Sequence, residues 1–145
     1  MRHRLAVVML ALALAVPPGA GAAASASGVV PVVSAKSHVK DLNADQVADI
    51  FLGKTSRFPD GTQAVPIDQP EDSPAREKFY AQFTGKSPAQ LKAYWSKIVF
   101  TGRGQPPRQV GSGAEAKRFV AQNPNAIAYI DASLVDESVR VVDGH

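Results

Sequence analysis

Three carboxylates precede an arginine in the segment PIDQPEDSPAREKF, residues 66–79. A short apolar run ends just before Asp68, and Ser73-Pro74 has the pattern of a helix start. A helix start that follows a strand can bind an anion, because its first N–H groups have no partner within the helix. Ser73 would supply a hydroxyl and Arg76 a positive charge. The segment is therefore a candidate oxyanion-binding site.

The carboxylates Asp68, Glu71 and Asp72 oppose an anion at this site. A helix start favours an anion by about 0.3–1 kcal/mol. Each carboxylate about 7 Å away opposes it by roughly 0.6 kcal/mol in water and about 2.4 kcal/mol at an effective dielectric constant near 20. Two interpretations stay open: the carboxylates face solvent, or the loop binds no free dianion. An alternative is that Glu71 and Asp72 only complement the helix dipole at the surface. If the site binds a ligand, we expect Asp68 to accept a hydrogen bond from a protonated ligand oxygen.

A second candidate anion contact lies in the segment GSGAE, residues 111–115. Small residues at a helix start expose backbone N–H groups, so Ser112 and Gly113 are predicted to contact the same anion. An ordinary N-cap role explains Ser112 equally well.

Few side chains are suited to catalysis. Apart from His3, histidine occurs only at His38, in a polar connection, and at His145, and the sequence has no G-x-S-x-G motif. We expect no catalytic residue, no enzyme activity and no cofactor. Calcium binding by the three carboxylates of residues 68–72 is a further hypothesis, but their spacing does not follow an EF-hand loop, so no metal site is predicted.

Helix-start and strand patterns predict a small α/β domain. Each of four predicted helices follows a capping residue, and these are Asn43, Ser73, Ser87 and Ser112. Apolar or β-branched runs predict strands at residues 29–33, 63–67, 126–130 and 139–142. Because strands and helices alternate imperfectly, we expect a small mixed sheet flanked by about four helices.

Two residues within these elements bear on the packing. Pro31 favours an edge position for the first strand, because proline has no backbone N–H to donate to a neighbouring strand. Trp95 lies between Leu91 and Ile98 at helical spacing. This spacing favours core packing of the indole over stacking on a ligand.

Residues 1–26 have the pattern of a secretory signal peptide. A basic start at residues 1–4 precedes an apolar run at residues 5–16, and small residues lead to a predicted cleavage near Ala26. The apolar run is too short to span a bilayer. We therefore expect a periplasmic domain formed by residues 27–145, with no membrane span after cleavage.

The predicted exported domain is nearly neutral. Without Arg2 and Arg4, 14 of the 16 basic residues remain, against 13 acidic residues. The sequence has no broad basic stripe with interleaved aromatic residues, so nucleic acid is not an expected partner. The absence of cysteine excludes disulfides, thiolate metal sites and a lipid-modified cysteine.

Four segments in order carry a family resemblance: LNADQVADIFLGKTSRFPDGTQAVPID, SPAREKFYAQFTGK, YWSKIVFTGRGQPP and FVAQNPNAIAYID. Together they resemble the phosphate ABC transporter substrate-binding proteins, and more closely the short, single-domain periplasmic members. The resemblance runs from Val29 to Val142. It implies one lobe of the type 2 periplasmic-binding-protein fold, a solute-binding function without catalysis, phosphate or another oxyanion as ligand, and an ABC permease as partner.

The family's ligand loop departs from its usual pattern here. Members usually carry an arginine and then a Ser-Gly-Ser/Thr helix start. Asp68 stands about where the arginine is expected, Ser73 matches the serine, and Pro74 removes a backbone N–H. The usual glycines of the last strand entry are Asn125 and Ala128 in this sequence. These departures predict weaker phosphate binding on an intact fold.

An alternative function is an interaction or structural module of the cell envelope. Such a module would dock a protein partner, or would form a homodimer that rebuilds a two-lobed cleft. The acidic loop and a length suited to one lobe motivate this alternative.

Overall fold

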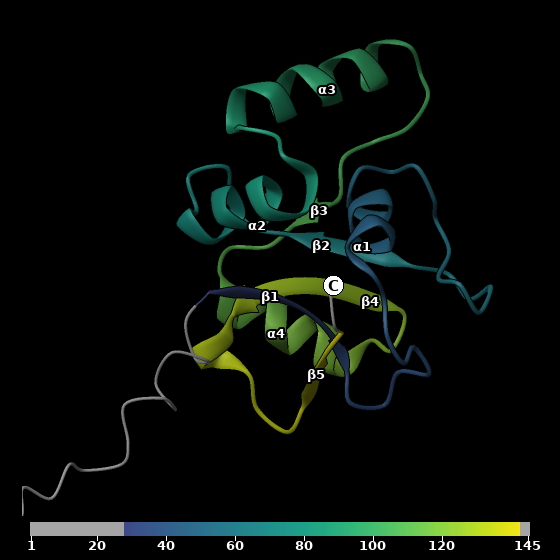
Figure 1. The fold of residues 1–145 in the computed structure, drawn as a ribbon, viewed down its shortest axis with the longest axis vertical. Helices are drawn as coiled ribbons and strands as arrows, with labels where there is room; N and C mark the ends of the chain where they lie inside the picture. The colour runs from purple at the N-terminus through teal and green to yellow at the C-terminus, as the bar shows by residue number, and fades with distance from the viewer. Residues whose placement is uncertain (1–27, 143–145) are drawn as a thin grey trace, which may run out of the picture.

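The computed structural model describes residues 28–142, and a five-stranded mixed sheet lies at its centre, in the order β3-β2-β4-β1-β5 (Figure 1). Strand β1 (Val29–Ser34) is antiparallel to its neighbours β4 (Ala126–Asp131) and β5 (Val139–Val141). Strand β2 (Val65–Asp68) is parallel to β4 and to β3 (Arg108–Gln109). The C-terminal ends of β2, β3 and β4 therefore lie at the same edge of the sheet.

Helices cover both faces of this sheet. Helix α4 (Gly113–Gln122) packs on one face, against β4 and β1, and α2 (Pro74–Thr84) packs on the other. Helix α1 (Ala44–Phe51) packs beside α2, whereas α3 (Pro88–Phe100) extends beyond α2, away from the sheet (Figure 1). A short 3-10 turn, η2 (Ala132–Leu134), follows β4. The predicted α/β class, with a small mixed sheet and four helices, is confirmed.

The core has two parts, one on each face of the sheet. On the α1–α2 face, Phe51 and Phe79 pack with Tyr129 of β4. On the α4 face, Ala116 and Val120 pack with alternate residues of the strands. Within residues 28–142 no helix has both the length and the apolar character that a membrane crossing requires.

Local capping explains where the helices begin. The side chains of Asn43, Ser73, Ser87 and Ser112 each accept a hydrogen bond from the N–H of the third helical residue. All four predicted N-caps are thus present. The second helix ends at Gly85, whose φ of 69° is left-handed and suits glycine.

The sequence-based prediction was wrong about Pro31 and missed one strand. Strand β1 is an interior strand rather than an edge strand, because β4 and β5 pair with it on opposite sides. The ladder to β5 begins only at Val32, and Pro31 accepts a hydrogen bond from the N–H of Val142 through its carbonyl. The missing N–H of Pro31 points to the same side as this carbonyl, so it faces Val142 at the end of the β5 pairing and interrupts no bond to β4. Strand β3, which is two residues long, lies in a segment predicted as loop.

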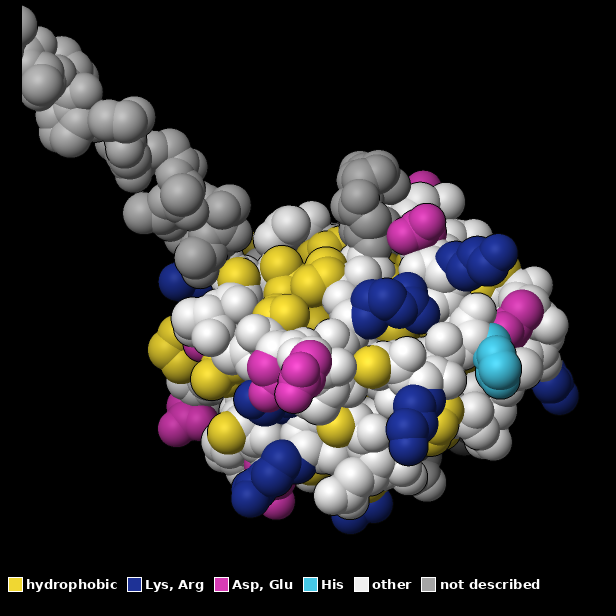
Figure 2. Space-filling model, turned by 90° about the horizontal axis from the view of Figure 1, so that it is seen from below, with side chains coloured by type: hydrophobic (Ala, Val, Ile, Leu, Met, Phe, Trp, Pro, Cys, Tyr) yellow, Lys and Arg dark blue, Asp and Glu magenta, His cyan; other side chains and the backbone are white. Residues whose placement is uncertain are grey.

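The face of the molecule seen from below carries interspersed charges. Figure 2 shows basic and acidic side chains alternating there, with no continuous basic stripe on that face. The predicted signal peptide (residues 1–26), its cleavage near Ala26 and His145 lie outside the described residues.

Candidate functional site

Two strand-loop-helix units meet at one edge of the sheet. One unit runs from β2 into α2, and the other runs from β3 into α4. The two loops are tied together, because the N–H of Val110 donates to the carbonyl oxygen of Asp68 (2.9 Å). The positive ends of two helix dipoles thus lie near the C-terminal ends of parallel strands. In open α/β sheets this edge is the usual place for a ligand.

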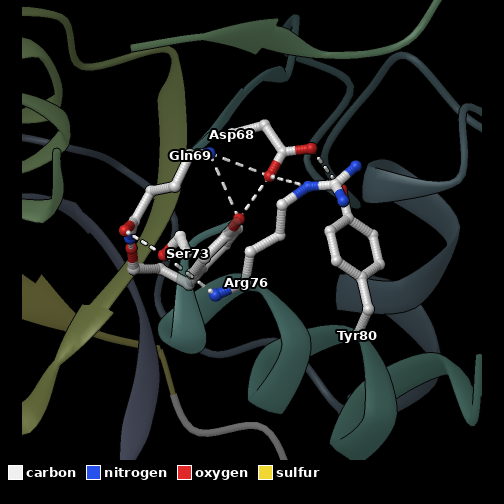
Figure 3. A network of polar contacts seen from close by, with 6 residues as sticks. Asp68, Gln69, Ser73, Arg76 and Tyr80 are labelled. Atoms are coloured by element: carbon white, nitrogen blue, oxygen red, sulfur yellow. Dashed lines mark hydrogen bonds and ion pairs between the residues drawn. The ribbon is translucent and has the colours of Figure 1, made fainter. Parts of the chain in front are cut away.

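Asp68 lies inside this edge and is only 1% exposed. Its Oδ1 accepts hydrogen bonds from the N–H of Gln69 (2.9 Å) and from the hydroxyl of Tyr129. Its Oδ2 accepts a hydrogen bond from the hydroxyl of Tyr80 (2.8 Å), as Figure 3 shows. Both oxygens therefore have donors within the protein. The predicted contact between Asp68 and a ligand oxygen stays a prediction, and because the residue is buried a ligand would reach it only if the surrounding side chains moved.

The two tyrosines at Asp68 are held in their protonated form. Burial first, and the Asp68 carboxylate second, raise the pKa of Tyr80 and of Tyr129 far above the ordinary value of 10.0. Packing fixes the ring of Tyr129, which stacks on Phe79 with the ring centres 4.1 Å apart. The tyrosines therefore act as oriented donors to a buried carboxylate.

Arg76 supplies the countercharge to Asp68. Its Nε lies 3.4 Å from Oδ1 of Asp68, and its guanidinium lies over the ring of Tyr80, 5.2 Å from the ring centre (Figure 3). The residue is 9% exposed. Within residues 28–142 its Nε is buried without a hydrogen-bond acceptor. The guanidinium is thus positioned by Tyr80 and Asp68 while part of its donor capacity stays unused.

The other two carboxylates of the loop, Glu71 and Asp72, are exposed. Two of the three carboxylates face solvent, as the first interpretation expects, whereas Asp68 is buried beside Arg76; that the loop binds no free dianion stays a prediction. These side chains therefore do not converge on a common point. Within the described part of the chain no group of three or more Asp, Glu, His or Cys residues could hold a metal ion.

Ser73 is occupied by local contacts. Its hydroxyl oxygen accepts a hydrogen bond from the N–H of Arg76 (3.3 Å), and its hydroxyl donates to Oε1 of Gln69 (3.1 Å). Gln69, in turn, donates from Nε2 to the carbonyl oxygen of Tyr129 (2.8 Å). The sequence analysis missed Gln69, which links the α2 start to β4. An uncharged residue between Asp68 and Pro70 gave no signal of this role.

The start of α4 approaches the same glutamine. A Cβ added to Gly113 would lie 3.7 Å from the amide of Gln69 and 3.3 Å from Leu134 Cδ1, so a small residue is needed there. Ser112 is exposed and caps the helix by accepting from the N–H of Glu115 (3.1 Å). Glu115 Oε2 accepts from the N–H of Gly111 (2.6 Å). A carboxylate of the protein thus already occupies one amide that an anion would use.

A groove with a volume of about 500 Å³ opens beside Arg76. One side of it is formed by Glu71 of the β2–α2 loop, by Arg76 of α2, and by residues just before and within β3, and α3 forms the other side. Its lining includes Glu71, Arg76, Lys92, Trp95, Val99, Pro106 and Gln109. The structure therefore brings Arg76 to a cavity, whereas Asp68, Ser73, Ser112 and Gly113 are not among the residues that line this groove.

Lys92 and Trp95 were not predicted as site residues. Trp95 was expected in the core, and it does belong to the core cluster while also lining the groove. A signal was present: Lys92, Trp95 and Val99 follow helical spacing and form a second face of α3. A face that combines a cation with an aromatic and an aliphatic side chain is neither a plain core face nor a plain solvent face.

Comparisons with known proteins address the fold. No family model matches the sequence, and no curated protein matches it. A protein from Clostridium perfringens, described as a phosphate ABC transporter substrate-binding protein with bound phosphate, superposes with a TM-score of 0.64 at 25% identity. An ABC-type phosphate transport receptor from Vibrio cholerae gives 0.63 at 19% identity, and PstS from Borrelia burgdorferi gives 0.55 at 14%.

The matches cover most of this chain but less than half of each solved structure. They extend over 81%, 81% and 82% of this chain, and over 45%, 46% and 47% of the three solved chains, respectively. All three neighbours are named as substrate-binding or phosphate-transport proteins, and none is named as an enzyme. The comparison confirms the resemblance noted in the sequence: over most of its length, this chain has the fold of phosphate ABC transporter substrate-binding proteins.

Proposed function

We propose that this chain is an exported, non-enzymatic solute-binding domain that binds an oxyanion, either phosphate or a related anion. One observation carries the proposal: the Arg76 guanidinium, which has unused donor capacity, lines a groove between α3 and the residues around β3. Lys92 adds a second cation to that groove. The likeness in fold to proteins named for phosphate transport supports the same ligand class.

Binding of free phosphate at this groove is expected to be weak. The charge of Arg76 is offset by Asp68, and Glu71 lies in the same groove as Lys92. The four groups sum to no net charge, so a dianion gains little from long-range attraction. An affinity near 1 mM, equivalent to about −4 kcal/mol, is consistent with this balance.

Ser73, Ser112 and Gly113 are proposed as additional contacts at the helix starts. Each lies near Gln69 or on the loops that join the parallel strands to α2 and α4. An anion there would have to compete with the Glu115 carboxylate for the N–H of Gly111. We therefore expect these three residues to contribute less to anion binding than Arg76 and Lys92 do.

Export and transport belong to the same proposal. The signal-peptide pattern of residues 1–26 supports a periplasmic location. An ABC permease is the proposed partner, since the neighbours in fold are named for ABC transport. Detection of a mature chain starting near Ser27 in the periplasmic fraction would support export, and a retained leader in the cytoplasmic fraction would contradict it.

Calorimetry and thermal unfolding with phosphate test the binding proposal. We expect a small rise in melting temperature at millimolar phosphate. The variant K92M should weaken binding severalfold, because it removes one cation from the groove. The matched variant K97M removes a lysine from the same helix at a position that does not line the groove, and it should leave binding unchanged. If no inorganic or organic oxyanion produces heat or a thermal shift, the proposal fails.

A second candidate function is an interaction module of the cell envelope. The observation that favours it is Phe100, which ends α3 and is 92% exposed. Its neighbour Val99 is 51% exposed, and adjacent exposed apolar side chains are typical of a contact surface. Light scattering and pull-down tests apply: a strict monomer that captures no envelope protein would count against this function, whereas loss of an observed complex in F100S would support it.

A further inference from the structure

The groove beside Arg76 is lined by both charged and apolar side chains. Arg76 and Lys92 supply two cations and Glu71 one carboxylate, and Trp95, Val99 and Pro106 supply an apolar wall. Its volume of about 500 Å³ falls within the range of about 300–1,000 Å³ that is usual for pockets that bind small organic molecules. A single inorganic phosphate would leave most of this space, and all of the apolar wall, without a partner.

Two side chains that line the groove each carry a buried nitrogen atom that makes no hydrogen bond. Within residues 28–142 these are Nε of Arg76 and Nε1 of Trp95. Both side chains line the groove, and the residues are 9% and 6% exposed. Both nitrogen atoms are inaccessible, and Nε of Arg76 already lies 3.4 Å from Oδ1 of Asp68, so a ligand would meet the remaining surface of these two side chains and not these two atoms.

The indole of Trp95 is held in place from behind. A Cβ added to Gly53 would lie 3.0 Å from Cη2 of Trp95, so the far edge of the six-membered ring rests on a residue without a side chain. The neighbouring Tyr94 donates to the carbonyl oxygen of Leu52 (2.6 Å), which ties α3 to the end of α1. The edge that carries Nε1 lies on the other side of the ring system. The wall is therefore fixed before a ligand arrives, which reduces the ordering that binding requires.

Inorganic phosphate finds an incomplete set of donors at this edge. Pro74, the first residue of α2, has no N–H, and the N–H of Gly111 is already bonded to Glu115. Arg76 shares its charge with Asp68. Since the polar contacts are few, a ligand that also buries apolar surface against Val99 and Trp95 has an advantage over a free ion.

From these features we infer that the groove binds an organic anion, in which one acidic group is attached to an apolar or aromatic body, in preference to inorganic phosphate. The acidic group pairs with the positive charges of Arg76 and Lys92. The apolar body packs against Trp95, Val99 and Pro106. This inference rests on the proposed oxyanion-binding function and names the substrate class of the same groove.

Trp95 provides a direct signal, since it is the only tryptophan in the chain. The test titrates the full chain with four probes and follows tryptophan emission and calorimetric heat. The probes are inorganic phosphate, phenyl phosphate, phenylacetate and the uncharged benzyl alcohol. We expect phenyl phosphate, phenylacetate or both to bind at least tenfold more tightly than phosphate and to change the emission of Trp95. Comparison of the two identifies the acidic group.

Two pairs of variants locate the binding. Val99 is 51% exposed and lines the groove, so V99S should lower the affinity for the organic anions severalfold while leaving the affinity for phosphate unchanged. The matched control is V141S, at an exposed valine of β5 outside the groove, and this variant should change neither the affinity for the organic anions nor that for phosphate. K92M should lower the affinity for every anion, whereas K97M should leave all of these affinities unchanged.

The outcomes separate this inference from the function on which it rests. Phosphate binding as tight as that of both organic anions would overturn the inference and leave the proposed function in place. Benzyl alcohol binding as tightly as the anions would overturn it as well, since charge would then play no part. The organic anions could also bind without changing the Trp95 emission and without any effect of V99S. That result would place the ligand outside the groove and would overturn the inference. If none of the anions binds, both proposals fall.

Discussion

The carboxylate of Asp68 and the guanidinium of Arg76 form a buried ion pair, with 3.4 Å between Oδ1 and Nε. The carboxylate side chain is 2% exposed and the arginine side chain 11%. Neither charge is stable alone in such surroundings, because taking an ion out of water costs several kcal/mol. The pair therefore serves the stability of the site as well as its charge, and four predictions test this and related features.

Replacement of Asp68 by asparagine should destabilise the protein strongly. The variant leaves the Arg76 cation buried without its partner and leaves one tyrosine hydroxyl without a good acceptor. We expect a loss of about 3–5 kcal/mol in the free energy of unfolding, measured by urea denaturation. The control D72N changes an exposed carboxylate of the same loop and should cost less than about 0.5 kcal/mol. Equal stabilities of the two variants would contradict the buried pair.

The protein should lose stability at alkaline pH because of Tyr80 and Tyr129. Burial and Asp68 raise their pKa in the folded state, so the folded protein keeps protons that the unfolded chain releases. This contribution is complete below the ordinary tyrosine pKa of about 10 and is lost as the pH rises above it, by up to about 1.4 kcal/mol per pH unit for each tyrosine.

Urea denaturation across that pH range provides the measurement for the tyrosine effect. In Y80F the slope of stability against pH above the tyrosine pKa should be shallower by the contribution of one tyrosine. Other titrating groups act equally in both proteins, so the difference in slope isolates Tyr80. Identical slopes would show that Tyr80 ionises as it does in water.

Replacement of Gly53 by alanine should displace Trp95. Gly53 has a φ of 70°, and its added Cβ would lie 3.0 Å from Cη2 of Trp95. Gly85 is a matched control, since its φ is 69° and nothing lies within 4 Å of its added Cβ. In both variants the left-handed conformation lowers the free energy of unfolding by about 1–2 kcal/mol. We expect G53A to cost a further 1–3 kcal/mol or so through overpacking, and only G53A to shift the tryptophan emission.

Replacement of Glu115 by alanine should strengthen anion binding if Ser112 and Gly113 are contacts. The variant frees the N–H of Gly111 and removes a negative charge from the α4 start. A gain of about 0.3–1 kcal/mol, or roughly two- to fivefold in affinity for phosphate, is expected. The control E137A removes an exposed carboxylate that is not part of that start. An unchanged affinity in E115A, measured by calorimetry, would remove Ser112 and Gly113 from the site.

Features that depend on neighbouring residues in the chain were predictable. Ser73 followed by Pro74 marks a helix start by itself, and glycine at position 85 marks the end of that helix. Such signals act through hydrogen bonds within a few residues, so the sequence contains all that determines them. The α/β class followed from the order of these local elements, and the family resemblance specified the fold.

Features that depend on distant partners were not predictable. Asp68 was expected to face a ligand or solvent, but it faces inward because Tyr129 and Tyr80 donate to it from β4 and α2. The residues around Asp68 give no indication that the hydroxyl of Tyr129, which lies far away in the sequence, donates to it. Likewise, helical spacing correctly placed Trp95 in the core, but it carries no information about the cavity beside it. Strand β3 is too short to give a periodic pattern and exists only through its pairing with β2.

The central pairing of the sheet has a consequence for folding during synthesis on the ribosome. Val29, at the beginning of β1, is paired with Asp131, at the end of β4, so the middle of the sheet joins the two extremes of the described chain. Contacts this far apart in sequence make folding slow. A nascent polypeptide that has not yet emerged as far as β4 lacks the partner of its own first strand. The domain should therefore stay open throughout most of its synthesis and close only when nearly all of its residues have left the ribosome.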